Sequence, residues 1–185
     1  MSQKKLTTAD IIITALFATM TFIGTMIRIP VPSPLGAPFI HLGNAMLLLA
    51  VLLIGFKKGA LAGGMGFAIF DILNGFAIEA PYFILESFIV GGIASITFSL
   101  FNKKDDHSYK IIIVALAAGI TKLVMTFLKN TVQLLFLGTD FKLAIPSAIM
   151  SLPATVVNVI STIIIVSLAY YPLKKLVHNF YHKPN

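Results

Sequence analysis

Polar residues inside otherwise apolar stretches are the side chains of this sequence best placed to do chemistry. One long apolar segment carries four of them, spaced four, three and four residues apart, so that an α-helix presents them on one face: Lys122, Thr126, Lys129 and Gln133. Asn130 lies beside this stripe. A charge at the centre of a bilayer costs at least about 2.5–3.5 kcal/mol on insertion scales, so such groups need partners or a cavity.

The preceding segment carries a second polar group. Tyr82 and Glu86 are one helical turn apart. A Glu86–Lys129 ion pair is expected at similar depth, and it either holds the bundle together or contacts a ligand directly. Asp71, one segment earlier, is expected to link helices, and Asn74 has the same expected role.

A proline-rich connection precedes two further candidates. Its four prolines exclude a helix and predict an extended, stiff loop that forms a lid or wall over a cavity: Pro30, Pro32, Pro34 and Pro38. His41 and Asn44 follow this loop, and His41 either anchors the loop or binds a ligand. Asn158 is the polar residue of the last apolar segment.

Composition places these residues in a membrane. Of 185 residues, 57% are hydrophobic and 11% charged, with a mean hydropathy of +0.93. Soluble domains are about 25% charged. The net charge of +7 then indicates basic flanking loops rather than nucleic-acid binding. The absence of cysteine excludes disulfide frameworks and thiolate metal sites.

Six apolar segments, each bounded by charge, proline or glycine, predict an all-α integral membrane protein of six transmembrane helices. They form one domain, residues 1–185, with spans at 9–29, 41–56, 59–78, 80–101, 110–138 and 144–171. The segment 41–56 covers only about 24 Å as a helix. We therefore expect it to lie at least partly inside the bundle.

Lysine placement predicts the orientation, because cytoplasmic loops accumulate basic residues. With the N-terminus inside, ten lysines are cytoplasmic: Lys4, Lys5, Lys57, Lys58, Lys103, Lys104, Lys110, Lys174, Lys175 and Lys183. Only Arg28 and Lys142 then lie outside. Both termini are therefore expected in the cytoplasm, with the basic pairs acting as topology signals rather than lipid sites.

Enzyme signatures are missing from the sequence. No Walker-type loop, His-Glu-x-x-His, Gly-x-Ser-x-Gly or metal-spaced acidic cluster occurs, so no catalytic residue, metal site or cofactor is predicted. His178 and His182 are spaced i,i+4 but are expected in a solvated tail. The small residues Ala15, Ala18 and Thr19 either pack internally or receive a partner helix.

Four stretches together resemble a known family. They are 39–44 (FIHLGN), 52–60 (LLIGFKKGA), 63–75 (GGMGFAIFDILNG) and 80–86 (APYFILE). Their ordered series resembles the substrate-binding S components of energy-coupling factor (ECF) vitamin transporters. The similarity is closest to the riboflavin-transporter-like branch, which includes proteins assigned to pyridoxine, hydroxymethylpyrimidine and riboflavin.

The resemblance implies a subunit of the prokaryotic plasma membrane that binds a vitamin near the outer face. It also implies docking to a transmembrane coupling subunit driven by two cytoplasmic ATPases, through a small-residue surface that Ala15, Ala18 and Thr19 match approximately. Relatives often have aspartate at the position of Asn44 and lysine at that of Glu86, so the vitamin itself is not implied.

The predicted function is high-affinity binding and translocation of a small vitamin, without ATP hydrolysis by this chain. Pyridoxine-like vitamin B6 or hydroxymethylpyrimidine is favoured over riboflavin or another vitamin. The predicted pocket comprises His41, Asn44, Tyr82, Glu86, Lys129, Asn130, Gln133 and Asn158. The alternatives are a stand-alone ion-coupled transporter and an intramembrane enzyme or structural membrane protein.

Overall fold

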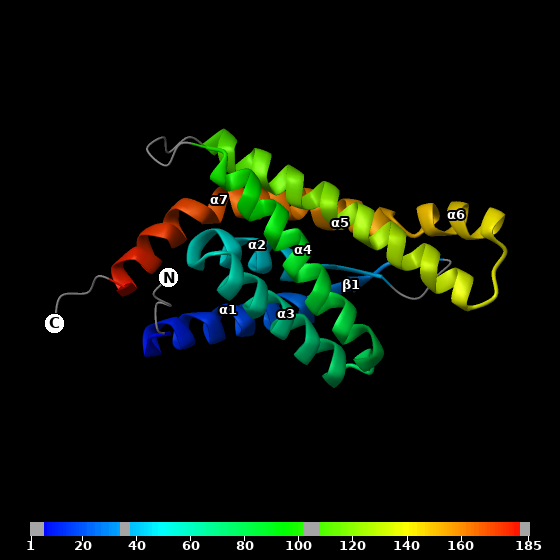
Figure 1. Ribbon diagram of the computed structural model, residues 1–185, viewed down its shortest axis with the longest axis horizontal. Helices are drawn as coiled ribbons and strands as arrows, with labels where there is room; N and C mark the ends of the chain where they lie inside the picture. Colours follow the sequence, from blue (N-terminus) through cyan, green and yellow to red (C-terminus); the bar gives the residue numbers. More distant parts are fainter. Residues whose placement is uncertain (1–5, 34–37, 102–107, 182–185) are drawn as a thin grey trace, which may run out of the picture.

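Long helices make up most of the chain in the computed structural model shown in Figure 1, which describes residues 6–33, 38–101 and 108–181. The elements in chain order are α1 (Thr8–Met26), β1 (Arg28–Pro30), β2 (Phe39–His41), α2 (Gly43–Ile54), α3 (Phe56–Leu73), the 3₁₀ turn η1 (Ala77–Glu79), α4 (Ala80–Ser99), α5 (Ser108–Phe136), α6 (Phe141–Met150) and α7 (Pro153–Tyr181). The predicted all-helical architecture is confirmed for these residues, with one short strand pair added.

Four stretches among the described residues are long and apolar enough to cross a membrane. They are Thr8–Met26, Ala77–Ser99, Ser108–Phe136 and Phe141–Tyr181. Large apolar side chains face outward along all of them, as on a surface that contacts lipid. The chain is therefore built as a membrane protein.

The last stretch is not one continuous helix. The predicted span 144–171 therefore contains a break that was not predicted from the sequence. The stretch divides into α6 and α7 at Ser151 and Leu152. Pro153 has no N–H for a helical hydrogen bond and disfavours helical backbone at the residue before it. The apolar composition of the segment concealed this break.

Helix α2 lies at the centre of the bundle (Figure 1). Nine of its twelve residues are buried, and it packs against α1, α3, α4 and α7. This confirms that the segment 41–56 lies inside the bundle.

Helix α3 packs closely on its neighbours through glycine. A Cβ on Gly59 would lie 2.4 Å from the Val51 Cα of α2, and a Cβ on Gly66 would lie 2.5 Å from the Ala18 carbonyl oxygen of α1. The backbones of α1, α2 and α3 can approach this closely only because these side chains are absent.

Three helix ends meet at one end of the bundle, on the left in Figure 1. Asp10 of α1 accepts from Lys58 Nζ of α3 at 2.6 Å and from the Tyr181 hydroxyl of α7 at 2.9 Å. We call this end, with the start of α1 and the end of α7, the termini end. The opposite end, which carries β1, β2, η1 and α6, is the hairpin end.

Some predictions fall on residues outside the described ranges. They concern Lys4, Lys5, Pro34, Lys103, Lys104, His182 and Lys183.

Candidate functional site

An antiparallel pair of short strands closes the hairpin end. Arg28 pairs with His41, Ile29 with Ile40 and Pro30 with Phe39, and Val31 N donates to the Pro38 carbonyl at 2.9 Å. Proline cannot continue a helix, so the chain after α1 is extended here. The expectation of an extended connection is confirmed for its described part.

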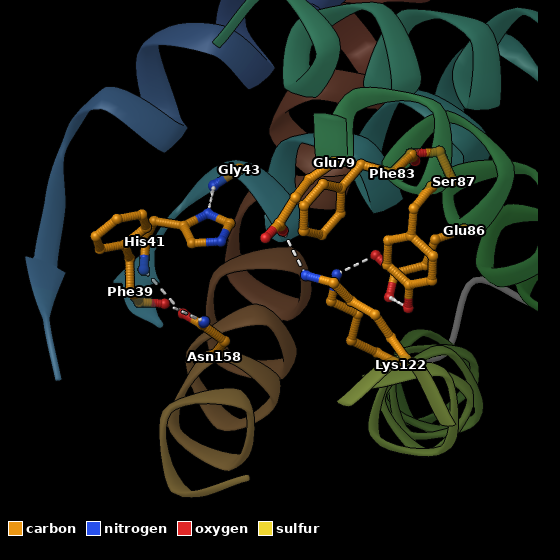
Figure 2. A network of polar contacts seen from close by, with 11 residues as sticks. Phe39, His41, Gly43, Glu79, Phe83, Glu86, Ser87, Lys122 and Asn158 are labelled. Carbon is orange, nitrogen blue, oxygen red and sulfur yellow. Dashed lines mark hydrogen bonds and ion pairs between the residues drawn. The ribbon is translucent and has the colours of Figure 1, made fainter. Parts of the chain in front are cut away.

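The side chain of Asn158 on α7 holds the second strand, β2, in place. Its Oδ1 accepts from His41 N at 2.8 Å, and its Nδ2 donates to the Phe39 carbonyl at 2.7 Å, as Figure 2 shows. Asn158 is buried. A single amide group therefore satisfies two backbone groups of β2 and joins the hairpin to a helix more than a hundred residues later in the chain.

Arg28 joins the first strand to α3. Its guanidinium carbon lies 4.5 Å from the ring centroid of Phe39 and 4.8 Å from that of Phe70. Its Nη2 donates to Asn74 Oδ1 at 3.1 Å. Both the rings and the amide hold this cation at the hairpin, so Asn74 links elements as expected.

His41 is a half-buried, neutral side chain beneath the hairpin. Its Nδ1 accepts from Gly43 N at 3.2 Å, and its ring meets the Phe67 ring edge-on at a centroid separation of 6.0 Å. Loss of hydration and, to a lesser extent, the nearby Lys122 ammonium together lower the pKa of His41 to about 3. With Nδ1 accepting, the proton of the neutral ring resides on Nε2, which is a donor.

Two ion pairs connect the antiparallel helices α4 and α5. Glu79, at the end of η1, pairs with Lys129, and Glu86 pairs with Lys122. The expected Glu86–Lys129 pair is therefore wrong. Glu79 and Glu86 are seven residues apart, as are Lys122 and Lys129, so antiparallel packing matches the first acid to the second lysine.

Aromatic side chains surround these charges. The ammonium groups of Lys122 and Lys129 lie 5.1 and 5.0 Å from the ring centroid of Phe83. The Tyr82 hydroxyl donates to Glu86 Oε1 at 2.8 Å. Figure 2 shows Phe83, Glu86 and Lys122 on one side of the site, facing Phe39, His41 and Asn158 on the other.

A cavity of about 190 Å³ lies between these two groups. Six aromatic side chains line it: Phe39, Phe67, Phe70, Phe76, Tyr82 and Phe83. Uncharged polar side chains of α1, α5, α7 and the α6–α7 junction add hydrogen-bonding groups: Thr25, Thr126, Asn130, Gln133, Ser151, Thr155 and Asn158. This arrangement suits a flat ring with polar edges.

Six of the eight predicted pocket residues line this cavity: His41, Tyr82, Lys129, Asn130, Gln133 and Asn158. Asn44 and Glu86 do not. They line a smaller space of about 20 Å³, deeper among α2, α4, α5 and α7, which shares Lys122 and Asn158 with the main cavity. Glu86 contacts Lys122 and Tyr82, so it supports the wall of the main cavity from behind.

Sequence reasoning missed Asp71, Glu79 and Lys122 as lining residues. The equal seven-residue spacing of the two acids and the two lysines would have identified the second ion pair. Asp71 was expected to link helices, but its Oδ2 is buried and has no hydrogen-bond partner. No sequence signal separates these two roles for a single buried carboxylate.

The predicted docking residues divide between two faces of α1. Ala15 and Thr19 are exposed, whereas Ala18 is buried against α3, where Gly66 makes room for the helix. The inclusion of Ala18 in an exposed surface is wrong. It belongs to the inward stripe with Phe17 and Thr21.

Asn158→Ala is expected to loosen the hairpin without unfolding the bundle. The change removes two hydrogen bonds, each worth about 0.5–1.5 kcal/mol net. Amide exchange at His41 should therefore rise about tenfold, measured by hydrogen–deuterium exchange of the detergent-solubilised chain. Val157→Ala, at an exposed neighbouring position, is the control. Unchanged protection at His41 would show that the hairpin is held by other contacts.

Comparison with known proteins identifies a family and a relative of this chain. The family model "ECF-type riboflavin transporter, S component" matches residues 5–175. A protein of Pyrococcus woesei, described as "Uncharacterized protein in gap 3'region", is 26% identical over 95 residues. That match covers 51% of this chain and 60% of the relative, so it spans less than two thirds of that protein.

Proposed function

Because the chain belongs to the family of ECF-type riboflavin transporter S components, we propose that it binds riboflavin or a close flavin relative in the cavity beneath the β1–β2 hairpin. S components are substrate-binding subunits rather than enzymes. The chain is therefore a transport subunit of the membrane, and ATP hydrolysis belongs to its partners.

The observation that supports this ligand is the pairing of aromatic walls with polar groups in one cavity. Flat rings gain most from aromatic surfaces that lie above, below and at their edges. Amides such as Asn130 and Gln133 can pair with ring nitrogens, carbonyl oxygens or hydroxyl groups. A three-ring flavin bearing a polyhydroxylated chain uses both kinds of surface.

The favoured prediction of pyridoxine or hydroxymethylpyrimidine gains no support from the family match, which supports the riboflavin alternative instead. We therefore place riboflavin first and keep the two smaller vitamins as competitors in the test.

We propose that the cavity faces the outside of a prokaryotic cell. Among the described residues, the termini end carries Lys57, Lys58, Lys174 and Lys175, whereas Arg28 and Lys142 lie at the hairpin end. Cytoplasmic loops accumulate lysine and arginine, which supports cytoplasmic termini and six crossings, with α6 and α7 forming the last.

Translocation in this proposal requires a transmembrane coupling subunit and two cytoplasmic ATPases. Ala15 and Thr19 on α1 offer a small-residue patch flanked by the exposed apolar side chains Ile11, Leu16 and Ile23. Small residues allow a second helix to approach closely in lipid. This face of α1 is therefore the proposed contact with the coupling subunit.

The test is ligand identification on the purified, detergent-solubilised chain. Mass spectrometry of small molecules released on denaturation should find riboflavin, and quenching of flavin fluorescence should give one-to-one binding in the nanomolar range. Pyridoxine and hydroxymethylpyrimidine should not compete. Retention of one of those vitamins instead would reassign the ligand, and potential-driven uptake by vesicles holding only this chain would favour an ion-coupled transporter.

A further inference from the structure

Among the charged residues that line the described cavity, Asp71 is the one without an ion pair. One of its two carboxylate oxygens, Oδ2, also has no hydrogen-bond partner among the described residues. Asp71 lies two residues before the end of α3 and is 4% exposed. A buried acceptor without a donor is costly, and native structures retain few of them.

The two lysines that line the cavity do not supply this donor, because each is paired with another carboxylate. Lys129 pairs with Glu79 and Lys122 pairs with Glu86. Counting Glu86 behind the wall, three carboxylates accompany two ammonium groups here, and Asp71 is the carboxylate without a lysine partner. Arg28, which is not among the lining residues, lies over the rings of Phe39 and Phe70 and donates to Asn74. Neither cavity-lining lysine is without a carboxylate partner.

From this geometry, and resting on the proposed function, we propose that Asp71 accepts a hydrogen bond from an N–H or O–H donor of the bound vitamin and makes the cavity select the unphosphorylated form over its phosphate ester. Riboflavin offers such donors in its ring imide and its ribityl hydroxyl groups. Flavin mononucleotide, its phosphate ester, adds negative charge and acceptor oxygens.

The selection follows from the chemistry of both partners. Phosphate groups are recognised by arginine, lysine or backbone N–H donors that are free to bind them. The lysines of this cavity are already bound to carboxylates, and ionised Asp71 repels an anion.

Two substitutions at Asp71 separate the acceptor from the charge. Asp71→Ala removes both, whereas Asp71→Asn keeps an acceptor oxygen and nearly the same volume but removes the charge. Riboflavin and flavin mononucleotide are titrated against each purified full-length variant in mildly alkaline buffer, with flavin fluorescence as the readout. Ile72→Ala, at an exposed position beside Asp71, controls for general damage to α3.

Asp71→Ala is expected to weaken riboflavin binding about tenfold or more, the usual effect of losing a buried hydrogen bond to a charged group. Asp71→Asn should weaken it less and should raise the affinity for flavin mononucleotide relative to riboflavin about tenfold, because the repelling charge is gone. The ratio of the two affinities is measured within one variant, so it is independent of the folded fraction.

The outcomes distinguish this inference from the proposed function. If the wild-type chain binds riboflavin and Asp71→Ala binds it equally well, or if Asp71→Asn leaves the affinity ratio unchanged, the role of Asp71 is wrong and the function stands. If the wild-type chain binds neither flavin, the proposed function itself fails.

Discussion

Lys122→Met should destabilise the protein by about 3–5 kcal/mol, the usual cost of leaving the partner of a buried ion pair uncompensated. The Glu86 side chain is 3% exposed and faces Lys122 across α4 and α5. Tyr82 would remain its hydrogen-bond donor, but no cation would balance its charge. The loss should appear as a lower thermal midpoint and a smaller monodisperse fraction in detergent.

Removing both charges tests this explanation. Combining Glu86→Gln with Lys122→Met leaves no buried charge, so the double variant should recover most of the stability lost in the single variant. Lys129→Met is the matched control, because the Glu79–Lys129 pair is more exposed, at 28% and 21% of the side chains. It should cost about 1 kcal/mol or less. A larger loss of stability for Lys129→Met than for Lys122→Met would contradict the conclusion that the Glu86–Lys122 pair is the more deeply buried of the two.

Gly59→Val should prevent α3 from docking on α2 and should cost about 3 kcal/mol or more, at or beyond the upper range for overpacked cores. A Cβ here would meet the backbone of α2, 2.4 Å from both the Cα and the N of Val51. Backbone cannot rotate away as a flexible side chain can. The measurement is again thermal unfolding in detergent, together with riboflavin affinity.

Gly92→Ala is the control for this substitution. The atoms nearest to a Cβ at Gly92 are ring carbons of Phe56 at 3.6 and 3.7 Å, which is ordinary contact. Its effect should fall within about 0.5 kcal/mol. If Gly59→Ala were equally silent, α2 would have room to move away from α3, and the close approach of these helices would not be needed for stability.

Hydrophobic segments and prolines predicted most of the architecture. The short length of the span 41–56 indicated that it lies at least partly inside the bundle, and nine of the twelve residues of α2 are buried. The break between α6 and α7 was not predicted, because Pro153 lies within a continuous apolar run. A proline in such a run either kinks a helix or ends one, and packing decides between the two.

The residues of the site that could be predicted from the sequence are those whose polar side chains would be costly in contact with lipid. Lys129, Asn130 and Gln133 must face inward, and they do line the cavity. The expected ion pair was wrong because Glu79, which directly precedes the predicted span 80–101, was not considered as a partner of Lys129. Asp71 was expected to link helices, but its Oδ2 has no hydrogen-bond partner among the described residues. A buried carboxylate can contact either a neighbouring helix or a ligand, and the sequence does not show which donors lie near it.

Helix α7 has a consequence for the order in which the protein is completed during synthesis. It is the last of the described helices to leave the ribosome, yet it packs on α2 and supplies the Asn158 amide that holds β2. Helix α2, twelve residues long, is too short to remain in the bilayer as a span on its own. The binding site can therefore form only after α7 has been inserted. A nascent chain that stalls before residue 153 can have inserted its earlier helices, but its ligand cavity is still incomplete.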